Sequence, residues 1–189
     1  YLLPGQEKQV REPDGTRRKE ILIKNTEDFK QRWDDAVNAL EDSIKRLQQP
    51  QEYGVISYKY LPYVSILPVF AALQQIIKKM DSVQKLEAQK KFRHWYWASV
   101  FTNRYSGSVE STSARDFIDM KTWFENDEHK PNVIQEFNSS FRNLDLINET
   151  KRGSSVYNGI FNLLVINGAR DWTIGDIPKP DDLDAHHIV

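Results

Sequence analysis

Apolar residues recur every three or four positions over residues 26–47, and this spacing predicts a long amphipathic helix. The repeating positions are Phe29, Trp33, Ala36, Val37, Leu40, Ile44 and Leu47. A period of 3.6 residues places them on one helical face. Asn25 or Thr26 is suited to cap the N-terminus, and Gln49-Pro50 is suited to end the helix.

Three further helices are predicted between residues 62 and 126. The helix within 62–80, with Pro62 in its first turn, must kink or restart at Pro68, because proline lacks an amide hydrogen and crowds the preceding turn. The helix at about 86–105 is apolar around most of its circumference, so we expect it at the centre of the core. A fourth helix follows at about 110–126.

The pattern after residue 130 predicts one or two short helices over 133–149 and a last helix that Ser154 or Ser155 caps. Asn167-Gly168 is suited to end that helix. The residues expected on its buried face are Val156, Tyr157, Ile160, Phe161, Leu164 and Val165.

The two ends of the chain differ from this helical body. Residues 1–24 are the least regular, with a turn expected at 12–15 and a short strand at 21–23. From residue 170 acidic residues and two prolines disfavour helix. The sequence therefore predicts a lead-in from a missing N-terminal domain (1–24), a helical domain (25–169) and a different module that starts at 170–189. The predicted fold class is mainly α, an irregular multi-helix bundle with little strand.

Composition excludes several classes of protein. The chain has 26 basic and 27 acidic residues, a net charge of −1 that argues against a histone-like binder but permits local patches. It has no cysteine, which removes disulfide scaffolds, thiolate zinc sites and cysteine nucleophiles. The uncharged run 60–77 is near the lower length of a membrane span, but its prolines favour a buried helix. We expect a soluble, cytoplasmic protein without a membrane partner.

Two adjacent histidines close to the end of the chain are the main candidates for chemistry. His186 and His187 follow Asp184 and precede two β-branched residues. Neighbouring side chains on a strand point to opposite faces, so at a turn one imidazole can bind a divalent metal while the other activates water. The alternative is a pair of solvent-exposed histidines in a tail.

Residues 184–189, Asp-Ala-His-His-Ile-Val, resemble the opening strand of the HNH (ββα-metal) nucleases. The stretches Lys91-Phe92-Arg93-His94-Trp95-Tyr96-Trp97 and Arg104-Tyr105-Ser106-Gly107-Ser108 are similar to a recurrent region of large bacterial proteins. Those proteins combine a ParB/sulfiredoxin-like domain, a helical middle and a C-terminal HNH module. GmrSD-type modification-dependent restriction systems and related phage-defence proteins belong to this group.

The resemblance implies a DNA endonuclease as the parent protein. His186 would take the metal-ligand place with support from Asp184, and His187 would be the general base. The cofactor would be a divalent metal, Mg²⁺. The Pro, Asn and last His or Asn of an HNH site are not in residues 1–189. We therefore expect this fragment to contain only the first strand of a ββα-metal module. We expect it neither to bind a metal ion nor to cleave DNA.

A basic segment beside tryptophans is the second candidate. Residues 78–93 carry six basic and two acidic residues, a net charge of +4. Lys90, Lys91 and Arg93 are placed to follow a phosphate backbone while Trp95 or Trp97 stacks on a base. The alternative is a set of surface lysines on a helix whose aromatic end is core.

Arg104 is the fourth candidate for a nucleic-acid contact. It either faces a phosphate together with Tyr105 and Ser106, or it interacts with the negative C-terminal end of the preceding helix. The alternative function for the whole chain is a non-enzymatic helical domain that binds a protein or a nucleic acid.

Overall fold

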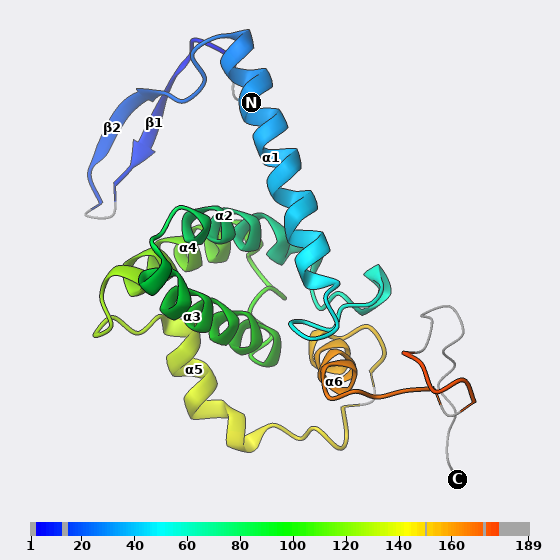
Figure 1. The fold of residues 1–189 in the computed structure, drawn as a ribbon. Helices are drawn as coiled ribbons and strands as arrows, with labels where there is room; N and C mark the ends of the chain where they lie inside the picture. Colours follow the sequence, from blue (N-terminus) through cyan, green and yellow to red (C-terminus); the bar gives the residue numbers. More distant parts are fainter. Residues whose placement is uncertain (1–2, 13–14, 150, 172, 178–189) are drawn as a thin grey trace. The chain divides into compact units, whose positions relative to one another are not determined.

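The computed structural model describes residues 3–12, 15–149, 151–171 and 173–177 and is mainly helical (Figure 1). Its elements in chain order are β1 (Glu7–Arg11), β2 (Arg17–Ile21), α1 (Thr26–Leu47), 3-10 turns at Tyr58–Tyr60 and Val64–Ile66, α2 (Leu67–Lys78), α3 (Ser82–Phe101), α4 (Val109–Glu125), α5 (Asn132–Ser140), a 3-10 turn at Phe141–Asn143 and α6 (Ser155–Ile166). The predicted mainly α fold with little strand is confirmed. The predicted first strand of a metal module lies outside the described residues.

Contacts divide the chain into two compact units, Tyr1–Glu41 and Asp42–Val189, and the boundary falls inside α1. The first unit contains the two strands and the first part of α1. The second contains the end of α1 and the helices α2 to α6, and it carries the hydrophobic core cluster. The limits predicted at residues 24 and 169 stay predictions.

The strands β1 and β2 pair as an antiparallel hairpin where the sequence indicated an irregular lead-in. Its register pairs Glu7 with Ile21 and Arg11 with Arg17. The strand predicted at 21–23 is wrong beyond its first residue, because β2 ends at Ile21. The strands were missed because they are mostly charged and lack the alternating apolar pattern from which strands are inferred.

The uncharged run 60–77 contains all of α2 except its last residue, Lys78, and the first turn of this helix settles the role of Pro68. A 3-10 turn precedes the helix and α2 starts at Leu67, so Pro68 lies in the first helical turn, where its missing N–H costs nothing. The helix therefore restarts there and does not begin at Pro62. None of the helices in the described part of the chain is both long and apolar enough to cross a bilayer.

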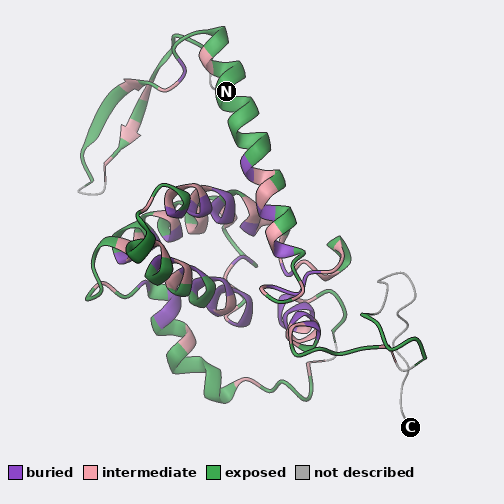
Figure 2. Ribbon diagram, viewed as in Figure 1, coloured by how far each residue is buried: buried purple, intermediate pink, exposed green. Residues whose placement is uncertain are grey.

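The central helix of the second unit is α3, as its apolar circumference predicted. It packs against α2, α4, α5 and α6, and buried residues cluster along it and along α2 (Figure 2). The carboxylate of Asp81 accepts hydrogen bonds from the amides of Val83 and Gln84, both at 3.0 Å, which starts the helix four residues before the predicted position. It ends at Phe101 because Asn103 adopts a left-handed conformation with φ 52°.

Aromatic rings fill the core beside α3. Tyr53 contacts Tyr96 edge-on at 4.7 Å between ring centroids and Phe70 at 5.3 Å, and Phe70 lies 4.5 Å from Phe92. All four side chains are fully buried. Offset and edge-on contacts of this kind stabilise a core beyond the burial of area alone.

The helix α6 buries only part of the predicted face: Val156 and Val165 are buried as predicted. Ser154 caps it as expected, accepting from the amide of Tyr157 at 3.1 Å. Its buried residues include Asn158, Gly159 and Asn162, whereas Leu164 is 53% exposed. The amide of Asn162 donates to the carbonyl of Tyr60 at 3.0 Å, and that of Asn158 donates to two neighbouring carbonyls. These bonds compensate the burial of polar side chains. The prediction is therefore wrong for Leu164, and it omitted the two buried asparagines.

Candidate nucleic-acid interface

The residues predicted for metal-assisted cleavage, Asp184, His186 and His187, lie outside the described residues. Their roles therefore stay predictions. Within the described ranges, no three His, Asp or Glu side chains gather closely enough to hold a metal ion. The other predicted contacts are Lys90, Lys91, Arg93 and Arg104.

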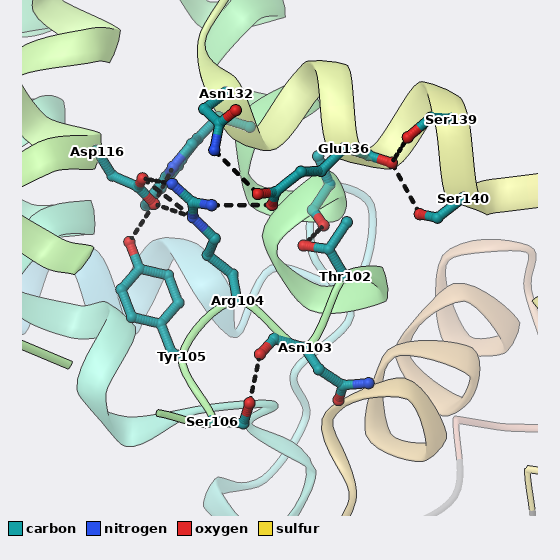
Figure 3. Close-up of polar contacts among 12 residues, drawn as sticks. Thr102, Asn103, Arg104, Tyr105, Ser106, Asp116, Asn132, Glu136, Ser139 and Ser140 are labelled. Carbon is teal, nitrogen blue, oxygen red and sulfur yellow. Dashed lines mark hydrogen bonds and ion pairs between the residues drawn. The ribbon is translucent and has the colours of Figure 1, made fainter. Parts of the chain in front are cut away.

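Arg104 lies between the carboxylates of Asp116 and Glu136 (Figure 3). Its side chain is only 8% exposed. Its Nη2 and Nε donate to Oδ1 of Asp116 at 2.8 and 3.2 Å, and its Nη1 donates to Oε2 of Glu136 at 2.9 Å. The carboxyl group of Asp116 is 1% exposed, so this is a buried, charge-assisted pair. The guanidinium is thus engaged by two carboxylates of the protein, and the contact of Arg104 with nucleic acid stays a prediction.

Asp116 also accepts hydrogen bonds from two buried aromatic side chains. The indole Nε1 of Trp95 donates to it at 3.3 Å and the hydroxyl of Tyr105 donates at 2.9 Å. Burial, together with the charge of Asp116, raises the pKa of Tyr105, so this hydroxyl remains a donor. The network joins α3 and the loop after it to α4 through Asp116 and to α5 through Glu136. Its role is structural.

Lys91 is engaged in the protein in the same way. Its Nζ donates to the carbonyl of Trp123 at 2.5 Å, bonds the carboxylate of Asp127, and lies 5.5 Å from the centroid of the Trp123 ring. The side chain is 13% exposed. Lys91 is thus bonded within the protein, and its contact with nucleic acid stays a prediction. Trp95 is fully buried, so its ring is not accessible for base stacking.

Lys90 and Arg93 remain on the surface and share an open groove along α3. Its volume is about 460 Å³. Its lining residues are Leu86, Gln89, Lys90, Arg93, His94 and Trp97. Steps of three and four residues place these side chains on one side of the helix. Among the described residues that line the groove there are two cations and no carboxylate.

Two rings in the groove are held by neighbouring aromatic side chains. Trp97 is half-buried and stacks on Phe101, with 6.1 Å between ring centroids and 24° between ring planes. His94 lies 6.1 Å from the ring of Trp123 and 6.2 Å from that of Phe137. Burial among these rings lowers the pKa of His94. His94 was not among the residues predicted from the sequence, although its spacing from Lys90 and Trp97 was the available signal.

The chain is 33% identical over 168 residues to the uncharacterized protein MJ0686 of Methanocaldococcus jannaschii. The alignment covers 82% of this chain and 26% of that protein, so the chain spans about a quarter of its relative's length. No protein-family model matches the sequence. No solved structure matches the chain. This chain therefore has a distant archaeal relative, and no family is assigned to it.

Proposed function

We propose that this chain is a nucleic-acid-binding domain that holds single-stranded DNA in the groove along α3. The observation that carries the proposal is the groove lining, which combines the cations Lys90 and Arg93 with the indole of Trp97 and contains no carboxylate among the described residues. A positively charged groove with an aromatic platform is the arrangement that binds single strands without sequence preference.

The phosphates of the strand would contact Lys90 and Arg93. These residues are three positions apart on α3, so their side chains are neighbours on the helix surface. Lys90 bonds Glu87 at 2.8 Å, but both side chains are more than half exposed, at 62% and 58%. Such surface pairs contribute little free energy, so a phosphate can replace the carboxylate at low cost.

A base of the strand would stack on Trp97. The indole is already held against Phe101, so it loses little side-chain entropy when a base is added. Stacking on an aromatic side chain contributes about 1–3 kcal/mol per base. An unpaired base is required, because the bases of a duplex are stacked on each other, and this favours a single strand over a duplex in the groove.

The test is fluorescence anisotropy of a labelled oligothymidine titrated with the whole chain at several salt concentrations. The double variant Lys90→Gln/Arg93→Gln should make the slope of log K against log salt less negative by about 1.4, since each phosphate contact on a single strand contributes about 0.7. Trp97→Leu should weaken binding roughly 5- to 150-fold, whereas Trp97→Phe should retain most of the affinity.

The matched control is Lys121→Gln, an exposed lysine on α4 outside the groove. It removes one charge and should leave the slope nearly unchanged. Binding that does not depend on salt, or groove variants that bind like the unaltered chain, would contradict the proposal.

A second proposal concerns the larger protein in which such a domain would work. The Asp184-Ala185-His186-His187 motif and the resemblance to GmrSD-type restriction proteins support a DNA endonuclease of the HNH type. Bound there, a divalent metal such as Mg²⁺ would polarise the scissile phosphate. In that site His186 and Asp184 would hold the metal, and His187 would take a proton from the attacking water.

This second proposal is tested on the full-length natural protein with plasmid DNA and Mg²⁺ or Mn²⁺. His187→Ala should abolish nicking without changing DNA affinity, and His186→Ala should weaken metal binding measured by calorimetry. Nicking that survives both substitutions would remove the HNH site assigned to His186 and His187 and leave the single-strand proposal untouched.

A further inference from the structure

A second basic surface lies on the hairpin of β1 and β2, in the other compact unit. Side chains alternate between the two faces of a strand, so the register separates the hairpin into two faces. The members of one face are Glu7, Gln9, Arg11, Arg17, Lys19 and Ile21. All of them are exposed, whereas on the opposite face Lys8, Val10 and Glu20 are half-buried and Arg18 is exposed. We call the exposed side the basic face of the hairpin.

Cations dominate the basic face. It carries Arg11, Arg17 and Lys19 against one carboxylate, that of Glu7. Lys19 and Glu7 lie 3.5 Å apart with side chains 71% and 61% exposed, which makes a weak pair. Arg17 donates from Nη1 to the neutral amide oxygen of Gln9 at 3.4 Å. Within the described ranges no carboxylate pairs with Arg11 or Arg17.

The register places Arg11 directly opposite Arg17. Like charges at directly opposed positions of an antiparallel pair destabilise it. Arg18 on the opposite face shows the usual alternative, since it forms ion pairs with Glu12 and Glu20. An anion placed between Arg11 and Arg17 would turn their repulsion into attraction, so the basic face is complementary to phosphate.

We propose that the basic face of the hairpin binds double-stranded DNA, with Arg11, Arg17 and Lys19 on its phosphates. The major groove of B-DNA is about 12 Å wide and admits a two-stranded ribbon, and two strands lie about 4.8 Å apart. Five-residue strands extend over roughly 16 Å, enough to cross from the groove floor to the flanking backbone. The major groove of double-stranded RNA is too deep and narrow for side chains to read.

The proposal does not depend on the groove along α3. It rests on different residues in a different compact unit, and it concerns duplex DNA where the groove concerns a single strand. Variants of the two surfaces therefore fail separately.

The experiment uses the whole chain and three labelled probes of one mixed sequence: a DNA duplex, the DNA single strand and the RNA duplex. Arg11→Gln/Arg17→Gln should make the salt slope for the DNA duplex less negative by about 1.8, because each phosphate contact contributes about 0.9. Its affinity for that duplex should fall roughly tenfold or more at 0.1 M salt. Arg11→Lys/Arg17→Lys keeps both charges and should keep most of the slope.

The matched control is Lys8→Gln, which removes a positive charge from the opposite face of the same strand. It should change the salt slope for the DNA duplex much less than Arg11→Gln alone or Arg17→Gln alone. The melting temperature of Arg11→Gln/Arg17→Gln should not fall, since the substitution removes a repulsion. This separates a lost contact from a lost hairpin.

The duplex slope decides the outcome. The proposal is overturned if Arg11→Gln/Arg17→Gln leaves the salt slope for the DNA duplex unchanged, or if Lys8→Gln changes it equally. It is also overturned if Arg11→Gln/Arg17→Gln weakens binding to the RNA duplex as much as binding to the DNA duplex. Lys90→Gln/Arg93→Gln provides the cross-check, because it should weaken binding to the single strand and leave binding to the duplex unchanged. If those variants bind the single strand normally while the hairpin variant loses the duplex, the groove proposal fails and the hairpin proposal stands.

Discussion

Replacing Asp116 by alanine would remove the one acceptor that three buried donors share. Arg104 would lose its closest counter-charge, and the indole N–H of Trp95 and the hydroxyl of Tyr105 would lose their hydrogen-bond partner. The exposed fractions of the Asp116 and Arg104 side chains are 1% and 8%, so water has little access to replace the lost contacts.

The expected cost follows from these groups. Breaking a buried ion pair by removing one partner costs about 3–5 kcal/mol, and each unpaired buried donor costs about 1–3 kcal/mol. The terms are not additive, and Glu136, 47% exposed, still offsets part of the charge of Arg104. We therefore expect Asp116→Ala to lower the free energy of unfolding by about 4–6 kcal/mol, a large part of the usual 5–15 kcal/mol.

Urea denaturation followed by circular dichroism measures this loss, and a thermal scan should show a fall in Tm of roughly 8–24 °C. Asp116→Asn keeps the shape and one acceptor, so its loss should be smaller. Glu136→Gln is the matched control on the same guanidinium, and its half-exposed pair should cost less than about 1 kcal/mol.

A double-mutant cycle separates the ion pair from the space that Asp116 fills. Arg104→Leu leaves the carboxylate buried without its cation, so the double variant Arg104→Leu/Asp116→Ala should lose less than the sum of the two single losses, by about 0.5–3 kcal/mol. A loss below about 1 kcal/mol for Asp116→Ala, or strict additivity in the cycle, would refute the structural role of the network.

Three further outcomes are expected. Gly159→Ala should cost about 1–3 kcal/mol in urea denaturation, because a Cβ there would meet the side chain of Val100, whereas Gly107→Ala, with open space around it, should cost far less. Burial lowers the pKa of His94, so on acidification the imidazole is protonated in the unfolded chain before it is protonated in the folded chain. The stabilising contribution of neutral His94 should therefore be full above about pH 6.5 and fall as the pH is lowered. His94→Gln should flatten this part of the plot of stability against pH. Tyr96→Phe should leave Tm unchanged or raise it, because its buried hydroxyl has no partner among the described residues; a clear fall would contradict this.

Local patterns were enough to locate the helices. The amphipathic repeat over 26–47 predicted α1 within a residue or two, and the turn residues around Ser154 and Asn167-Gly168 predicted both ends of α6. These signals work because helix periodicity and capping depend on residues only a few positions apart. The hairpin escaped detection because its strands are stabilised by pairing with each other and not by an apolar face.

The buried face of α6 required the tertiary structure. Gly159 permits α3 to approach closely, and Asn158 and Asn162 satisfy carbonyl groups about a hundred positions earlier in the chain. Hydrophobicity alone placed Leu164 on the buried face and did not include the two asparagines in it. Long-range hydrogen bonds reverse that assignment, because a buried amide is tolerated when its partners are in place.

The basic residues of the candidate interface show the same division. The sequence by itself determined that Lys90, Lys91 and Arg93 lie on one helix close to Trp97. Only the tertiary structure decided that Lys91 bonds to α4 and the turn after it, and that Arg104 bonds to Asp116. Successive residues on a helix point about 100° apart. Lys91 therefore faces a neighbouring helix while Lys90 remains in solvent. Which of these side chains can bind a phosphate depends on where carboxylates from distant parts of the chain lie, and the spacing of residues along the sequence does not give those positions.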